Sequence, residues 1–266
     1  MLELYHFWDS PCCFKVRTVL AEYHLEWTER YIMTVHFDHL QPEYQILNPH
    51  SRVPTLVYDG LIVIQSSVIA EYIDDQFGNG ALKPKSAAAL AVMREWMADE
   101  QEYLFPLIVP MSFNTMMKLR SKAYGLDQLI EWSKRHPDQI RAKDYLQRMS
   151  GPADMDAVVA AEKKFAWHME RLETQLQKTS GPWICGDDYS LADISVAPLL
   201  DRVEHLDRSR LYDALPLVAG WYQRMKERPA FMKATPPPEF RMWGPVKPIP
   251  AQQVDAAAAG YTFPSD

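Results

Sequence analysis

Strand and helix patterns alternate over the first eighty residues of this 266-residue chain. The strongest local signal is Asp59-Gly60, which predicts a hairpin of two antiparallel strands, Thr55–Tyr58 and Leu61–Ile64. The patterns before it predict strand, helix, strand and short helix, in that order, at Leu2–His6, Phe14–Tyr23, Trp27–Met33 and Pro42–Leu47. A helix over Ser66–Phe77 then ends at Gly78-Asn79-Gly80. The order β-α-β-α-β-β-α predicts an α/β domain over residues 1–80, whose first strands pair in parallel through helical crossovers.

Strand patterns almost vanish after this domain. Residues 81–85 read as a linker, and helical patterns follow, with the apolar residues of Met155–Gln177 on one face. Ser190 and Asp193 have the spacing of a capping box at a helix start, and Pro198 is predicted to kink or interrupt that helix. The sequence therefore predicts an all-helical domain over residues 86–234 and an extended, proline-rich tail over residues 235–266.

Composition and charge argue against several classes of function. A nucleic-acid-binding face needs concentrated Lys and Arg, whereas the formal net charge is −7. No stretch approaches the roughly 20 apolar residues that span a bilayer, and the first residues lack a signal-peptide pattern, so we expect a cytoplasmic protein. Three cysteines and eight scattered histidines give neither a disulfide framework nor metal-ligand spacing. We expect no metal.

Three short motifs of the first domain stand where a predicted strand or helix begins or ends. Ser10-Pro11-Cys12-Cys13 follows the first strand, and a helix start there favours a thiolate through its dipole and its unpaired N–H groups. Arg52-Val53-Pro54-Thr55 precedes the third strand, and X-Pro is the one common place for a cis peptide bond. Gln65-Ser66 opens the last helix of the domain. In the second domain, the capping residues lie within Ser180–Ile194.

Together these motifs resemble the cytosolic glutathione S-transferases over about Met1 to Phe231, among them bacterial zeta-like enzymes, hydroquinone dehalogenases and β-etherases. The resemblance implies a thioredoxin-like N-terminal domain and an all-α C-terminal domain. It also implies that Pro54 is cis and that the backbone of Val53 pairs with the cysteinyl backbone of glutathione, like an added strand. A trans proline at the start of an edge strand is the alternative.

The same resemblance implies sites for the two ends of glutathione. Gln65 and Ser66 would receive the γ-glutamyl carboxylate, with Ser66 capping the helix at its positive end. His39 and Arg52 resemble the basic positions that hold the glycyl carboxylate. A plain helix cap and solvated surface residues are the respective alternatives.

Three candidates lie near the sulfur. By the resemblance, Ser10 falls on the catalytic serine of zeta-like enzymes, and Cys12 falls on the nucleophilic cysteine of hydroquinone dehalogenases. Cys13 aligns with the active-site serine of β-etherases. We favour Ser10 as the donor that holds the thiolate, with Cys12 able to form a mixed disulfide if the enzyme is reductive. For Cys13 we favour inert packing inside the first helix.

The second substrate is expected to bind beside this thiol. The long insert between Phe105 and Met155 resembles the extended helical region of the bacterial dehalogenases and β-etherases. Apolar side chains that could line a pocket for an aromatic compound are Phe7, Trp8, Phe105, Ile108, Met111, Phe113 and Met116. Ordinary core packing is the alternative for this stripe.

We therefore predict a homodimeric glutathione transferase that acts on a small apolar or aromatic electrophile, in detoxification or in the catabolism of aromatic compounds. β-Aryl ether cleavage, dehalogenation and zeta-like isomerisation are the candidate reactions. A thiol–disulfide reductase or deglutathionylating enzyme that uses Cys12, and a non-catalytic scaffold with this fold, are the alternatives.

Overall fold

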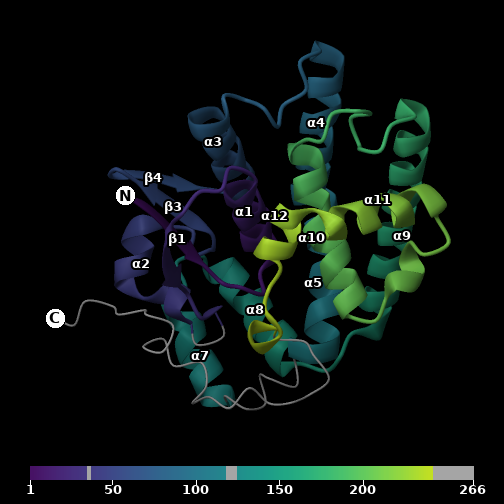
Figure 1. Cartoon of the computed structure of the whole chain (residues 1–266). Coiled ribbons are helices and arrows are strands. Elements are labelled where there is room, and N and C mark those ends of the chain that lie inside the picture. The colour runs from purple at the N-terminus through teal and green to yellow at the C-terminus, as the bar shows by residue number, and fades with distance from the viewer. Residues whose placement is uncertain (35–36, 118–124, 242–266) are drawn as a thin grey trace.

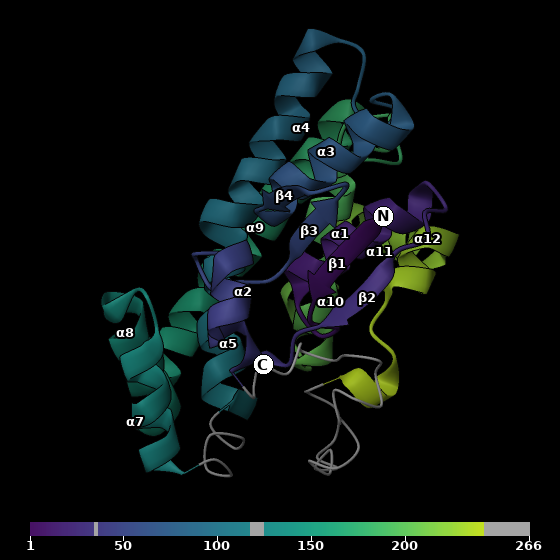
Figure 2. The ribbon, with the colours of Figure 1, turned by 90° about the vertical axis from the view of Figure 1, so that its left-hand side faces the viewer.

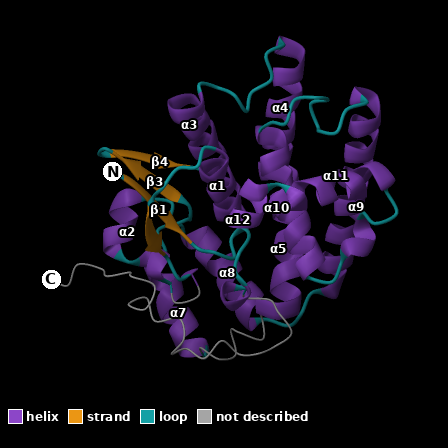
Figure 3. Ribbon diagram, in the orientation of Figure 1, coloured by secondary structure: helices purple, strands orange, loops and turns teal. Residues whose placement is uncertain are grey.

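The computed structural model describes residues 1–34, 37–117 and 125–241. Its strands lie together at one side, and helices with their connecting loops form the remainder of the described structure (Figure 3). The elements of the first half are β1 (Leu2–His6), α1 (Pro11–Glu22), β2 (Thr28–Tyr31), α2 (Pro42–Leu47), β3 (Thr55–Tyr58), β4 (Leu61–Ile64) and α3 (Ser66–Gly78). This is the predicted order of strands and helices.

The four strands form one mixed sheet with the order β2-β1-β3-β4. β1 pairs in parallel with β2, whereas β3 is antiparallel to both β1 and β4. Asp59 and Gly60 join β3 to β4 with φ values of 47° and 84°. Positive φ at both central residues is what a type I′ hairpin turn requires, and its twist matches that of the strands. The hairpin prediction is confirmed.

Helix α1 begins at Pro11, three residues before the predicted start at Phe14. Ser10 is its N-cap residue, and Pro11 occupies the first helical position, where its missing N–H removes no hydrogen bond. Because of this earlier start, Cys12 and Cys13 lie in the first turn of α1 rather than in the loop before it.

The regular elements described in the second half are all helices, and two isolated β-bridges, Trp183–Gly186 and Cys185–Asp188, lie between them. Its helices are α4 (Ala87–Asp99), α5 (Phe105–Ser112), α7 (Leu126–Arg135), α8 (Gln139–Ser150), α9 (Met155–Thr179), α10 (Leu191–His205), α11 (Pro216–Glu227) and α12 (Pro229–Ala234). π-Helical turns, η3 (Glu100–Leu104) and η4 (Phe113–Met117), extend α4 and α5. None of the helices described here has the length and apolarity needed to cross a membrane.

Helix α10 lies at the centre of the main core and packs against α1, α4 and α11 (Figure 1). It runs through Pro198, so the predicted interruption is wrong. The residues from Leu191 to Leu200 are all buried, so this helix is packed on all sides. This packing offsets the loss of the backbone hydrogen bond that proline cannot donate. The predicted capping box at Ser190 and Asp193 is confirmed.

Helices α7 and α8 form a separate pair that lies below α2 and beside α5 (Figures 1 and 2). They join the first half through a second apolar cluster, in which Phe37 stacks on Trp132 with ring centroids 4.8 Å apart. The long insert therefore contacts the half that carries the sheet, and not only the other helices.

Candidate active site

Ser10 stands at the N-terminus of α1, where the helix directs its positive end. Its hydroxyl oxygen accepts a hydrogen bond from the backbone N–H of Cys13 at 3.4 Å, and its own N–H donates to the carbonyl oxygen of Phe7 at 3.1 Å. The Ser10 side chain is half-buried and borders a cavity. A thiolate placed beside this hydroxyl would be stabilised by the helix dipole and by a hydrogen bond.

The two cysteines of the first turn have different surroundings. Cys13 is fully buried, the backbone N–H of Phe7 points at its sulfur from 3.5 Å, and burial raises the pKa of its thiol. Cys12 is partly exposed, yet burial and the charge of Glu100 raise the pKa of its thiol to about 12, against the opposing charge of Lys15. At neutral pH both are therefore thiols, and the thiol is the less nucleophilic form.

The Val53–Pro54 peptide bond is cis, as predicted. The loop before it is held by two side chains from α2 and its C-terminal end. The Tyr44 hydroxyl and the Asn48 amide donate to the carbonyl oxygen of Arg52, at 2.5 and 2.8 Å. Both also contact the Thr55 hydroxyl, at 2.9 and 3.0 Å. These buried contacts hold the loop that carries Val53 just before β3 begins.

At α3 the prediction needs a correction. The N-cap position is held by Gln65, with φ 72° and no side-chain capping bond, and Ser66 is the first helical residue. The Ser66 hydroxyl accepts a hydrogen bond from the Lys15 ammonium at 3.3 Å, and the Ser67 hydroxyl accepts one from the same ammonium at 3.1 Å. Lys15 also forms an ion pair with Glu100.

The buried pair of Lys15 and Glu100 was missed by sequence reasoning. Each side chain is 1% exposed. A lysine within an apolar helix implies a buried acidic partner, but the two residues are 85 positions apart and belong to different halves. Asp99, the neighbour of Glu100 in sequence, pairs with Arg171 at 2.6 Å.

The two basic positions proposed for the glycyl carboxylate differ in exposure. His39 is buried, and its Nδ1 has no hydrogen-bond partner within the described structure. Arg52 is exposed. Along the chain, His39 and Arg52 precede the cis Val53–Pro54 peptide bond, and Ser66 follows it.

A cavity of about 150 Å³ lies beside Ser10. Four of the predicted pocket residues border it, namely Phe7, Phe105, Ile108 and Phe113. Its wall also includes residues that sequence reasoning missed, namely Asp9, Pro11, Thr34, Val109, Ser112, Met117, Tyr145 and Arg202. The cavity is thus largely apolar and aromatic, with hydroxyl groups and one guanidinium at its edge.

Two predicted pocket residues with described side chains, Met111 and Trp8, do not border this cavity. Met111 is fully buried in the main core, because its side of α5 faces the other helices. Trp8 stacks on Phe240 at 5.8 Å, and the guanidinium of Arg17 lies over its ring. The side chain of Met116 lies outside the described part of the structure.

The charged groups of the cavity are paired with each other. The Arg202 guanidinium, on α10, donates to the backbone oxygen of Asp9 and lies 3.1 Å from its carboxylate. Tyr145, on α8, contacts Phe113 edge-to-face at 4.8 Å, and burial raises the pKa of its phenol. The cavity therefore offers the neutral hydroxyl of Tyr145 as a donor and the buried, Asp9-paired guanidinium of Arg202, both beside apolar side chains.

Comparisons with known proteins assign the two halves of the chain. Residues 9–76 match the family model "Glutathione S-transferase, N-terminal domain", and residues 143–233 match "Glutathione S-transferase, C-terminal domain". The chain belongs to the glutathione S-transferase family. The predicted class of glutathione-dependent enzyme is thereby confirmed, as is the predicted pairing of a thioredoxin-like half with an all-helical half.

Several relatives of this glutathione S-transferase act in different reactions. It is 25% identical to a tetrachloro-p-hydroquinone reductive dehalogenase of Sphingobium chlorophenolicum, over 90% of this chain and 98% of the relative. It is 27% identical to a probable maleylacetoacetate isomerase of Vibrio cholerae, over 88% of this chain and 95% of the relative. Among solved structures, the β-etherase LigF of Sphingobium sp. strain SYK-6 aligns with a TM-score of 0.79 at 23% identity, over 88% of this chain and 98% of LigF.

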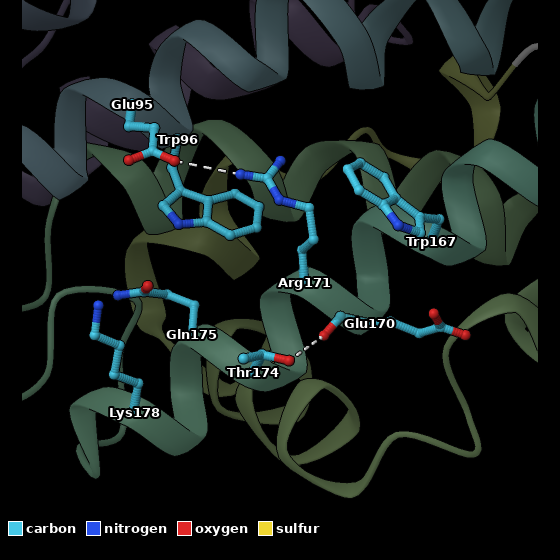
Figure 4. Close-up of a pocket in the computed structure, with 8 residues that line it drawn as sticks. All are labelled: Glu95, Trp96, Trp167, Glu170, Arg171, Thr174, Gln175 and Lys178. Atoms are coloured by element: carbon cyan, nitrogen blue, oxygen red, sulfur yellow. Dashed lines mark hydrogen bonds and ion pairs between the residues drawn. The ribbon is translucent and has the colours of Figure 1, made fainter.

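A second, larger depression lies on the outer side of this transferase. It has a volume of about 420 Å³ and is formed by α4 and α9 alone. Figure 4 shows the Arg171 side chain rising between the rings of Trp96 and Trp167, with Glu95 bonded to its guanidinium. None of its lining residues comes from the half that carries Ser10, so this depression is separate from the cavity beside Ser10.

Proposed function

We propose that this chain is a glutathione transferase in which Ser10 activates the thiol for attack on a small aromatic electrophile. The observation that carries the proposal is the position of Ser10. Of the three candidates Ser10, Cys12 and Cys13, it alone borders the aromatic cavity, and it does so from the positive end of a helix. Glutathione would bind along Val53, with its γ-glutamyl carboxylate at Ser66.

The chemical step is a displacement at carbon. The glutathione thiol gives its proton to solvent, and the thiolate, held by the Ser10 hydroxyl, forms a bond to a carbon of the electrophile. The bond from that carbon to a halide or phenolate oxygen breaks, and the leaving group departs with the electron pair. Most of the rate gain would come from the lowered thiol pKa and from positioning.

Aromatic substrates are favoured by the composition of the cavity wall. Phe7, Phe105 and Phe113 supply the aromatic surface. Tyr145 keeps its proton because burial raises its phenol pKa, so it can donate a hydrogen bond to a departing oxygen. This donor supports aryl ether cleavage, which expels a phenolate, as one reaction of this site. Displacement of halide from an aromatic ring is the other.

Ser10→Ala and Cys12→Ala distinguish the mechanisms, assayed with glutathione and an aryl ether that releases a chromogenic phenolate. Loss of the Ser10 hydroxyl should lower kcat/KM on the order of 100-fold, because one hydrogen-bond donor to a developing or stabilised anion has this effect. Cys12→Ala should change kcat/KM less than about threefold, since its thiol stays protonated. If only the Cys12 change abolishes activity, and a mixed disulfide can be trapped on Cys12, the chain is a reductase. If millimolar glutathione gives no thermal shift, the chain is a scaffold.

We also propose that two copies of the chain associate through the outer faces of α4 and α9. Tyr103 and Trp167 are each about half exposed, at 52% and 53%, although both are large and apolar. They lie together because both rings pack on His168, at 5.9 and 4.8 Å. Sedimentation should give a dimer, and Trp167→Glu should shift it toward monomer. A cytoplasmic location stays a prediction.

A further inference from the structure

A basic cluster lies where α8 packs against the loop that leads to the cis peptide bond. It consists of His39, Arg52, His136 and Arg141. The guanidinium of Arg141 donates to the carbonyl oxygen of His50 at 3.4 Å, two residues before Arg52. None of the four residues forms an ion pair with a carboxylate in the described part of the chain. Asp38 and Asp138 are the acidic groups nearest to them in sequence. The carboxylate of Asp38 accepts from the N–H of Met33 at 2.9 Å, and that of Asp138 caps α8 by accepting from the N–H of Arg141.

The positive charges of this cluster act on one another. Burial lowers the pKa of His39 to about 3, and the charges of Arg141 and His136 contribute to this decrease. The pKa of Arg141 is lowered by burial and by the charge of Arg52. His39 is only 8% exposed, and its Nδ1 lacks a hydrogen-bond partner in the described structure. Crowded cations beside a buried nitrogen without a partner form a site that a carboxylate would stabilise.

Helix α8 connects this cluster with the aromatic cavity. Arg141 and Tyr145 are four residues apart on α8, so their side chains project from the same face, one turn apart. Arg141 faces the loop at His50, whereas Tyr145 borders the cavity and packs on Phe113 and Trp132, at 4.8 and 4.9 Å. A contact that fixes the position of Arg141 therefore also fixes Tyr145, which forms one wall of the cavity.

We infer that Arg141 binds the glycyl carboxylate of glutathione together with His39 and Arg52, and that this contact fixes α8 and the Tyr145 wall for the electrophile. The inference rests on the proposed function, which places glutathione along Val53. It adds Arg141, a residue of the insert, to the glutathione site. It also makes the electrophile cavity depend on the glycyl end of glutathione, which takes no part in the chemistry.

The first test compares glutathione with γ-glutamylcysteine, which lacks the glycine, by calorimetric titration. Arg141→Gln should weaken glutathione binding about 10-fold, because a charge-assisted hydrogen bond is lost. It should leave the binding of γ-glutamylcysteine unchanged, so the preference of the wild type for glutathione shrinks by the same factor. Arg148→Gln is the matched control, since Arg148 lies on the same helix and pairs with Asp144 on an exposed surface.

The outcomes separate this inference from the function on which it rests. If Arg141→Gln weakens both ligands equally, or neither, Arg141 does not bind the glycyl carboxylate. Arg141→Lys guards against a loss of folding, because it keeps the charge and should recover part of the preference. If the wild type binds neither ligand, the proposed function fails, and this inference fails with it.

The second test follows the amides of α8 by hydrogen exchange. Saturating glutathione should slow exchange over Gln139–Ser150 in the wild type, whereas saturating γ-glutamylcysteine should not. In Arg141→Gln neither ligand should slow it. Equal protection by both ligands in the wild type would overturn the coupling between the glycyl carboxylate and the cavity wall.

Discussion

At the scale of single residues, two buried histidines make the stability of the fold sensitive to acid. Burial lowers the pKa values of His6 and His39 to about 4 and about 3, whereas an unfolded chain titrates histidine near 6.5. Below about pH 6.5 the unfolded state therefore binds protons that the folded state does not, so the free energy of unfolding falls as the pH falls toward 4. His39→Gln should reduce this slope by about 1 kcal/mol per pH unit, as measured by urea unfolding at several pH values.

His50→Gln is the control for this prediction. Its imidazole is exposed, and its backbone N–H and carbonyl groups hydrogen-bond to Asn48 and Arg141, so this variant shows what the replacement of an exposed histidine does to the slope. An unchanged slope in His39→Gln would mean that His39 is protonated in the folded protein.

Residues with local signals could be predicted from the sequence, and residues that act through distant partners could not. Pro54 after Val53 and Ser190 before α10 each have a physical meaning that depends on neighbours in sequence. The significance of Lys15 depends on Glu100, and that of Arg141 depends on a loop residue 91 positions earlier. No periodicity joins such pairs, since only the tertiary fold brings them together.

At the scale of elements, Asp193 determines how α10 begins. Its carboxylate accepts from the N–H groups of Ile184 and Ser190, from the Ser190 hydroxyl and from the Trp221 indole, at 2.8–3.1 Å. Asp193→Ala leaves these buried donors without an acceptor and should cost about 3 kcal/mol or more in the free energy of unfolding. Asp154→Ala removes the exposed cap of α9 and should cost about 1 kcal/mol. Equal losses in urea unfolding would mean that Asp193 acts only as a cap.

The boundaries of elements were predictable where turn chemistry sets them. The β3–β4 hairpin is fixed by Asp59-Gly60, and α9 begins at Met155 as predicted. The prediction failed where packing competes with local preference, as at Pro198, or where a cap was overlooked, as at Ser10. The docking of α7 and α8 could not be predicted, because it depends on the stacking of Phe37 on Trp132, which is 95 residues away in sequence.

At the scale of the whole molecule, the two halves are joined by ion pairs that are removed from water. Lys15 and Glu100 form one such pair, and Asp9 and Arg202 form another. Both pairs lie beside groups proposed to bind glutathione or the electrophile. The proposed active site therefore lies at the junction, and each half should lose its part of the site if the two separate.

The pair of Lys15 and Glu100 provides the test of this junction. Lys15→Met leaves the Glu100 carboxylate buried without its partner and should cost about 3–5 kcal/mol in the free energy of unfolding. Replacing both residues by methionine should restore most of that loss, because no charge stays buried. Lys134→Met is the matched control, since its pair with Glu131 lies exposed on the surface, where an ion pair contributes little to stability. Glutathione titration of the double variant separates stability from binding. The affinity of the double variant for glutathione should stay reduced, because Ser66 has lost the ammonium that orients it. If both the stability and the glutathione affinity recover fully, the ion pair serves only to hold the two halves together.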